Sequence, residues 1–308
     1  MHNYEQVAPQ TLFKYRDDSI RTEEIIINKK IWLSSPAQLN DPLECRIGEI
    51  PKDWEANNIR IMERAQLMGV IAPPPSFEPP RQLFSLSERE TKQWLKRLKK
   101  LTHSRQVQAM RALYAQHGIQ LSRPDNVFKD MRKRLSSVGI FSLSETCHDE
   151  LMWAHYGACH QGIALGFSWS TDCKLANPRN CLPVTYSREK PAFKSGFKNE
   201  IQIMPPGSGM PNSQRVSFED DVFRSTISTK TPVWEYEKEW RYIEEGHGLF
   251  DFPGVLSQVV FGMRMSSERK NHYKELIREN IHNGVEYFEI VESADLSGIE
   301  VRRAGLKI

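Results

Sequence analysis

The sequence lacks the features that mark several classes of protein. Its 308 residues include five cysteines, an odd number with no CxxC pair, which argues against a disulfide framework and favours reduced thiols in the cytoplasm. No apolar run approaches the roughly 18 residues of a membrane span, so no membrane partner is expected. The first residues contain no apolar core of a signal peptide. The formal net charge of +3 is too small to argue for nucleic acid by itself.

Common ligand-binding and nucleophile motifs are also missing. Neither GxGxxG nor a P-loop lysine pattern occurs, which excludes the usual glycine-rich loops that bind the phosphates of dinucleotides and nucleoside triphosphates. Two pairs could place a nucleophile beside an acid or base, Cys159 with His160 and Ser144 with Glu145. Neither pair has the glycine context of a nucleophile elbow, so neither predicts that chemistry.

Several potential metal ligands cluster near the middle of the chain. On a helix, His155 and Cys159 would share one face, because they are four residues apart. The spacing of the cluster matches no standard zinc pattern, so no metal site is predicted. The cluster consists of Cys147, His148, His155, Cys159 and His160.

The pattern of elements predicts an α+β fold with a mixed sheet. Residues 11–16 and 30–35 read as strands around a short helix, and Asn40-Asp41-Pro42 forms a turn. Residues 51–137 have helical periodicity and predict a helical insertion within a single domain, 1–308. Strands return from residue 138 onward, with helices at 147–157, 218–229 and 266–281 between them. The segments 72–80 and 204–213 are rich in proline and predict loops.

The segment 232–246, PVWEYEKEWRYIEEG, alternates in a way typical of a strand. On an extended chain Glu235, Glu237 and Glu239 would share one face and Trp240 would lie on the other. One interpretation is a solvent-facing edge strand with a ladder of charges. The other is a strand that is covered on its aromatic face and lines a cleft with its carboxylates.

A basic segment lies inside the predicted insertion. Residues 92–105 contain six Lys or Arg residues. This run favours a solvated helix face over a phosphate-binding patch, but both interpretations stay open.

Several motifs together resemble a widespread bacterial family known as a domain of unknown function, DUF2971. They occur in order along the chain, cover both of its ends and skip the predicted insertion. The motifs are FKYR, IWLSSPAQLNDPLEC, FSLSE, LMWAHYGACHQGIALGF, VTY and WEYEKEWRYI.

The order of elements also resembles the ADP-ribosyltransferase fold, the DNA-modifying toxins most closely. This resemblance implies NAD as the substrate and a catalytic Glu239, which polarises the ribose and stabilises the oxocarbenium-like state as nicotinamide leaves, with Glu237 on the same face. The first motif would hold NAD through Arg16, with Tyr15 as its neighbour. Further residues implied to contact NAD are Ser142 and Ser144 of the second motif, and Trp153 or Tyr156 stacking on nicotinamide.

Other polar residues are candidates for the same cleft. Asn40 and Asp41 form a turn, and Asp41 or Glu44 could instead pair with Arg16 or Arg241. The complete set of these candidates is Ser35, Asn40, Asp41, Glu44, His155, His160, Glu237 and Arg241.

Three functions remain open from the sequence. The first is an NAD-dependent ADP-ribosyltransferase-like enzyme, a toxin or phage-defence effector that modifies nucleic acid or protein. The second is a nucleic-acid-binding or nuclease-like defence protein, in which residues 92–105 contact phosphates and His155 and His160 act with the glutamates. The third is a non-catalytic interaction module. The first requires Arg16, Ser142 and Glu239 to converge.

Overall fold

The computed structural model describes residues 8–46, 51–71, 81–121, 123–191, 198–202, 213–282 and 284–304. Two compact units can be distinguished. The first comprises Met1–Arg46, Arg134–Pro191 and Phe223–Ile308, and the second comprises Ile47–Lys133 and Ala192–Val222. Of the predicted loops, 72–80 lies outside the described residues, as does 204–213 apart from Ser213.

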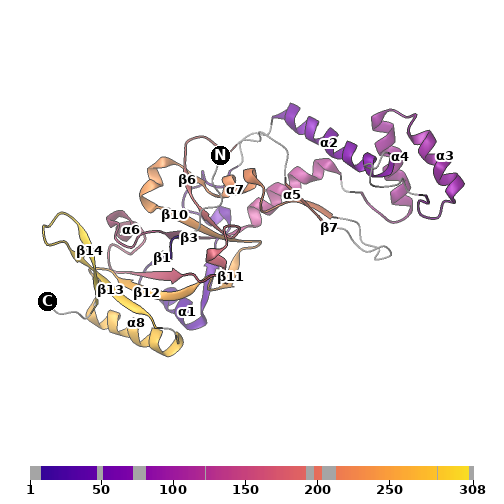
Figure 1. Ribbon diagram of the computed structural model, residues 1–308. Helices are drawn as coiled ribbons and strands as arrows, with labels where there is room; N and C mark the ends of the chain where they lie inside the picture. The colour runs from indigo at the N-terminus through magenta and orange to yellow at the C-terminus, as the bar shows by residue number, and fades with distance from the viewer. Residues whose placement is uncertain are drawn as a thin grey trace. The chain divides into compact units, whose positions relative to one another are not determined.

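The first unit is built on an eight-stranded mixed sheet (Figure 1). All neighbouring strands are antiparallel except the parallel pair β12–β13. The α+β class and the mixed sheet therefore agree with the sequence. In spatial order the strands are β14 (Ile299–Arg303), β13 (Glu286–Glu292), β12 (Val255–Phe261), β4 (Ile163–Ser168), β1 (Thr11–Arg16), β3 (Gly139–Ser144), β10 (Glu239–Glu244) and β5 (Cys181–Pro183).

Shorter elements complete this unit. The helices are α1 (Ile20–Asn28), α6 (Glu150–His155), α7 (Asp221–Ile227), which begins in the second unit, and α8 (Ser267–Asn280). Two small strand pairs join β2 (Lys30–Leu33) to β11 (Gly248–Asp251), and β6 (Thr185–Tyr186) to β9 (Thr229–Lys230). Single 3₁₀ turns are η1 (Pro36–Gln38), η2 (Lys174–Ala176) and η3 (Pro232–Glu237).

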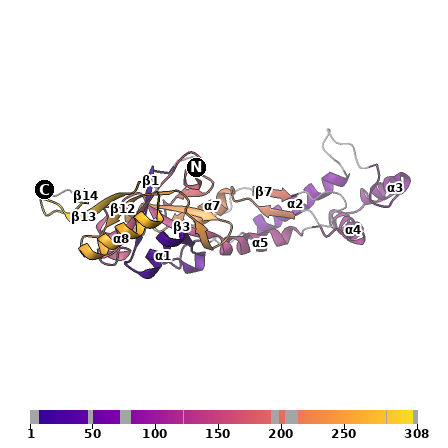
Figure 2. The same cartoon turned by 90° about the horizontal axis from the view of Figure 1, so that it is seen from below.

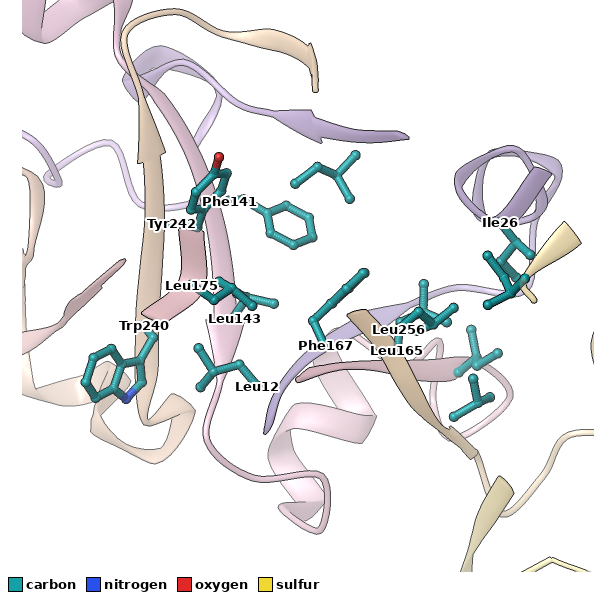
Figure 3. Packing of buried hydrophobic residues seen from close by; sticks show 14 of the residues in the cluster. Leu12, Ile26, Phe141, Leu143, Leu165, Phe167, Leu175, Trp240, Tyr242 and Leu256 are labelled. Atoms are coloured by element: carbon teal, nitrogen blue, oxygen red, sulfur yellow. The ribbon is translucent and has the colours of Figure 1, made fainter. Parts of the chain in front are cut away.

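Alternation along the strands divides the buried side chains between the two faces of the sheet. Leu12 and Leu165 belong to the larger core, which helices α1 and α8 cover, and Figure 3 shows members of this cluster. Phe13 and Ala164 belong to a smaller core, which α6 covers with Trp153. Figures 1 and 2 show α8 lying along the sheet beside β12 and β13.

The second unit is mainly helical. It contains α2 (Lys52–Ile71), α3 (Glu88–Leu98), α4 (His103–Gln116) and most of α5 (Pro124–Ser137), with the hairpin β7 (Asn199–Gln202) and β8 (Ser213–Val216). Ser87 and Glu90 form a capping box at the start of α3. The basic segment 92–105 spans the end of α3, a turn and the start of α4, and its Lys and Arg side chains are exposed. None of the described helices is long and apolar enough to cross a membrane.

Candidate functional site

Five charged side chains meet in the interior of the first unit, and we call them the charge cluster. Each residue is at most 7% exposed. Lys230 Nζ lies 2.6 Å from a Glu237 oxygen and 3.2 Å from oxygens of both Glu239 and Glu44. Arg241 Nε lies 2.9 Å from Glu239, and its Nη2 bonds Glu44. Three carboxylates therefore surround two cations.

Arg241 is the best-satisfied member of the cluster. Its Nε and Nη2 donate to the two oxygens of Glu239 at 2.9 and 3.1 Å, in the fork geometry that favours arginine over lysine. Its Nη1 donates to the Ile227 carbonyl at 2.5 Å and lies 3.7 Å from Cys45 Sγ. Because a buried cation without partners is costly, these contacts explain how a fully buried guanidinium is tolerated.

A turn, rather than strand alternation, brings the glutamates together. Residues 232–237 form η3, in which Pro232 occupies the first turn, and Lys238 then adopts a left-handed conformation with φ 43°. Strand β10 begins only at Glu239. The predicted three-glutamate strand face is therefore wrong: Glu235 is exposed, whereas Glu237 and Glu239 both reach Lys230.

Strand β10 is also neither an edge strand nor the wall of an open cleft. It lies between β3 and β5, and Glu239 to Ile243 are buried on both faces. Trp240 and Tyr242 enter the larger core, and Glu239 and Arg241 point to the other side. The carboxylates are thus internal groups that need partners.

The surroundings drive the pKa values of two neighbouring carboxyls apart. Burial raises the pKa of Glu239, but Arg241, Lys230 and a hydrogen bond from Ser142 outweigh burial and lower it to about 2. Burial also raises the pKa of Glu237, and there Lys230 and Tyr156 offset the effect only in part. Burial opposes the charge of Lys230, but the three carboxylates raise its pKa.

A chain of hydrogen bonds connects Glu237 to the surface. Tyr156 Oη donates to Glu237 at 2.7 Å, and the exposed Asn40 donates from Nδ2 to Tyr156 Oη at 3.2 Å. Burial is the main cause of the raised pKa of Tyr156, and the Glu237 carboxylate adds to it. Tyr156 therefore stays protonated at neutral pH and can donate to this carboxylate.

The sheet register separates two of the residues that the resemblance groups together. Ser144 pairs with both Phe13 and Glu239, so these side chains share one face. Arg16, three residues after Phe13, pairs with Ile163 of the larger core and lies on the other face. The predicted convergence of Arg16 with Glu239 is therefore not found.

Arg16 makes local contacts instead. It bonds Thr22 Oγ1 at 3.4 Å and lies 3.8 Å from Asp17. Ser142 and Ser144 do lie at the cluster: Ser142 pairs with Arg241 across β3 and β10, and Ser144 Oγ donates to the Glu237 carbonyl at 2.7 Å.

The aromatic candidates differ in accessibility. Trp153 has no exposed surface, and its indole donates to the Cys147 carbonyl at 2.8 Å, so the prediction that it stacks on nicotinamide does not fit this structure. Tyr15 is also buried, packs edge-to-face on Trp153 at 5.0 Å and donates to the Thr146 carbonyl. Tyr156 is half-buried and contacts the cluster directly.

The turn after η1 contributes a member of the cluster. Glu44 pairs with Arg241, whereas Asp41 accepts the Trp234 indole N–H at 3.1 Å and the Leu43 amide. Ser35 lies at the edge of this region and bonds Gln38 in the cap of η1.

In the part of the chain that the structure describes, His155 and His160 form no hydrogen bond or ion pair with the charge cluster. Exposed His155 ends α6, so Cys159 is not on the same helix face, which corrects that expectation. His160 stacks on Trp153 at 6.3 Å. Among the described residues, no three His, Cys, Asp or Glu side chains are placed to hold a metal ion.

Sequence reasoning missed Lys230, which contacts all three carboxylates, and Tyr186, whose Oη accepts the Glu239 amide at 2.8 Å. Charge counting points to Lys230 only once the burial of the carboxylates is known, because three buried glutamates and one arginine cannot balance.

We expect Glu237→Gln to be tolerated. The change leaves two carboxylates and two cations, and Lys230 keeps Glu44 and Glu239, so the loss in unfolding free energy should stay within about 1.5 kcal/mol. Urea unfolding at pH 7 measures it. A loss as large as that of Glu239→Gln would contradict this charge balance.

Comparison with known proteins gives one match. Residues 152–242 match a family model described as a protein of unknown function, DUF2971. The match covers less than one third of the chain and contains four of the five cluster residues, all except Glu44. No curated protein and no solved structure matches the chain.

Proposed function

We propose that the chain cleaves the N-glycosidic bond of NAD, with the charge cluster as its catalytic centre. Because Arg16 lies on the other face of the sheet, this proposal rests on the charge cluster itself and not on the arrangement that the ADP-ribosyltransferase resemblance requires. One observation carries the proposal. Glu237 and Glu239 share the ammonium of Lys230, yet their surroundings move their pKa values in opposite directions. Carboxyl pairs whose pKa values are driven apart are typical of sites that combine a fixed anion with a proton-exchanging group.

The chemistry gives the two carboxylates different roles. Cleavage of the bond builds positive charge on the ribose, which a preorganised anion stabilises. Both oxygens of Glu239 are engaged by Arg241 and Lys230, so Glu239 acts as a positioning residue through Lys230. Glu237 would contact the ribose as the proton-exchanging group, and the fixed negative charge of Glu239 would act on the developing positive charge from behind it. The resemblance alone gave both roles to Glu239.

Access to Glu237 would come from the side of Tyr156. Asn40 is exposed and Tyr156 is half-buried, so rotation of these two side chains would open the path. Tyr236 lies beside Trp234, with 6.2 Å between the ring centroids, and His155 lies 6.3 Å from Tyr236. These partly exposed rings offer nicotinamide a stacking surface in place of the buried Trp153.

The test is nicotinamide release from NAD, with DNA and cell lysate offered as acceptors of the ADP-ribose. We expect the wild-type protein to release nicotinamide and Glu237→Gln to lose activity by at least roughly a hundredfold, the usual contribution of a proton-transferring group. The matched control is Glu235→Gln, an exposed glutamate of the same turn, which should keep full activity. No release by the wild type with either acceptor, or full activity in Glu237→Gln, would overturn the proposal.

A further inference from the structure

A pocket of about 570 Å³ opens to solvent between the C-terminal half of α8, the loop after it and β13. Figures 1 and 2 show α8 beside β13. Its size is within the range of small-molecule sites. It shares no residue with the charge cluster. The residues that matter for its chemistry are Lys274, Arg278 and His282, with Ile277, Ile281 and Tyr287.

The polar part of the lining is basic. Lys274, Arg278 and His282 follow one another at intervals of four residues, and no carboxylate lines the pocket in the described part of the chain. None of the three forms an ion pair among the described residues. Two glutamates of the neighbouring strand β13 are engaged elsewhere: Glu289 pairs with Lys270, and Glu286 pairs with Arg303.

The remaining wall is apolar and partly aromatic. Tyr287 stacks on Phe261 with 6.2 Å between the ring centroids and an angle of 1° between the rings. Lys274 Nζ lies 5.8 Å from the Tyr287 centroid, so a cation and a flat ring border the same space. A ligand that fits this lining has an anionic end and a planar, less polar end.

We propose that this pocket binds a nucleoside monophosphate. The phosphate would contact Arg278 and Lys274, because a guanidinium matches phosphate oxygens in a bidentate manner and an ammonium adds a point charge. The base would pack against Tyr287 and the isoleucines. Basic residues in the last turn of a helix can also serve only to stabilise the helix dipole. That role would explain the charges but not the pocket or its aromatic wall.

Calorimetric titration of the full chain tests this proposal. The probes are the four common ribonucleoside 5′-monophosphates, with inorganic phosphate and adenosine as the two halves of the ligand. We expect at least one monophosphate to bind with a Kd below about 1 mM, and each half to bind more weakly. Arg278→Ala, an exposed position, should weaken binding by roughly tenfold or more, since it removes a charge-assisted contact.

Two control variants locate the binding. Lys30→Ala removes one partly exposed cation from β2, and Glu237→Gln alters the charge cluster, so both should leave the Kd unchanged. No binding of any monophosphate at about 1 mM would overturn the proposal, as would an unchanged Kd in Arg278→Ala. Because the readout is binding to a separate site, the result does not depend on whether NAD is cleaved.

Discussion

Replacing Arg241 by methionine should lower the free energy of unfolding by about 3–5 kcal/mol, the usual cost of removing one partner from a buried ion pair. Methionine fills a similar volume but donates no hydrogen bond. The side chain of Arg241 has no exposed surface, and its loss leaves Glu44 without its guanidinium partner and Glu239 with only Lys230. The midpoint of urea unfolding measures the effect.

A surface pair provides the control for this experiment. Arg303 and Glu286 form an ion pair with side chains 61% and 49% exposed, and Arg303→Met should cost at most about 1 kcal/mol. The loss of unfolding free energy in Arg241→Lys should lie between the losses in Arg241→Met and Arg303→Met. Lysine keeps the charge but cannot donate two parallel hydrogen bonds to Glu239. Equal unfolding midpoints for Arg241→Met and Arg303→Met would show that the charge cluster does not stabilise the fold.

Acid should remove a large part of the stability through Glu239. Its pKa is about 2 in the folded chain and 4.5 in the absence of the fold. A depressed folded-state pKa contributes stability that is fully present above pH 4.5 and is lost as pH falls toward 2. The difference corresponds to about 3 kcal/mol.

Urea unfolding from pH 7 to pH 2, on the wild type and on Glu239→Gln, isolates this contribution. A protonated glutamic acid resembles glutamine. The difference in unfolding free energy between the wild type and Glu239→Gln should therefore shrink as the pH falls from 4.5 to 2. The comparison cancels other groups that titrate in the same range, such as Asp18, whose pKa Arg269 and Tyr273 lower against the effect of burial. If the difference in unfolding free energy between the two proteins stays constant over this range, Glu239 is not strongly paired in the folded chain.

Local patterns predicted elements well where neighbouring residues decide the conformation. Strands β1, β3 and β4 and helix α8 occur close to where the sequence places them, and Ser266 caps α8. The prediction of a strand over residues 232–238 was wrong, because the same alternation of residue types can occur in a strand and in a short polar turn. Pro232 was the signal that this part of the chain does not extend a ladder.

The site depended on information that a single sequence does not contain. The order of the motifs correctly predicted that five residues lie in one region: Glu44, Ser142, Ser144, Tyr156 and Glu239. Whether Arg16 joined them depended on the register between β1 and β3, and one residue of register decides the face. Lys230 was missed because its importance appears only when the carboxylates are known to be buried.

The most direct test of the account is a titration of Glu237 and Glu239 by ¹³C NMR of their carboxyl carbons. The resonances can be assigned from their loss in Glu237→Gln and Glu239→Gln. We predict that Glu239 stays ionised down to about pH 2, while Glu237 takes up its proton above 4.5, its usual value. If both carboxyls titrate together near 4.5, their surroundings do not separate them, and the proposed division between a fixed anion and a proton-exchanging group is wrong.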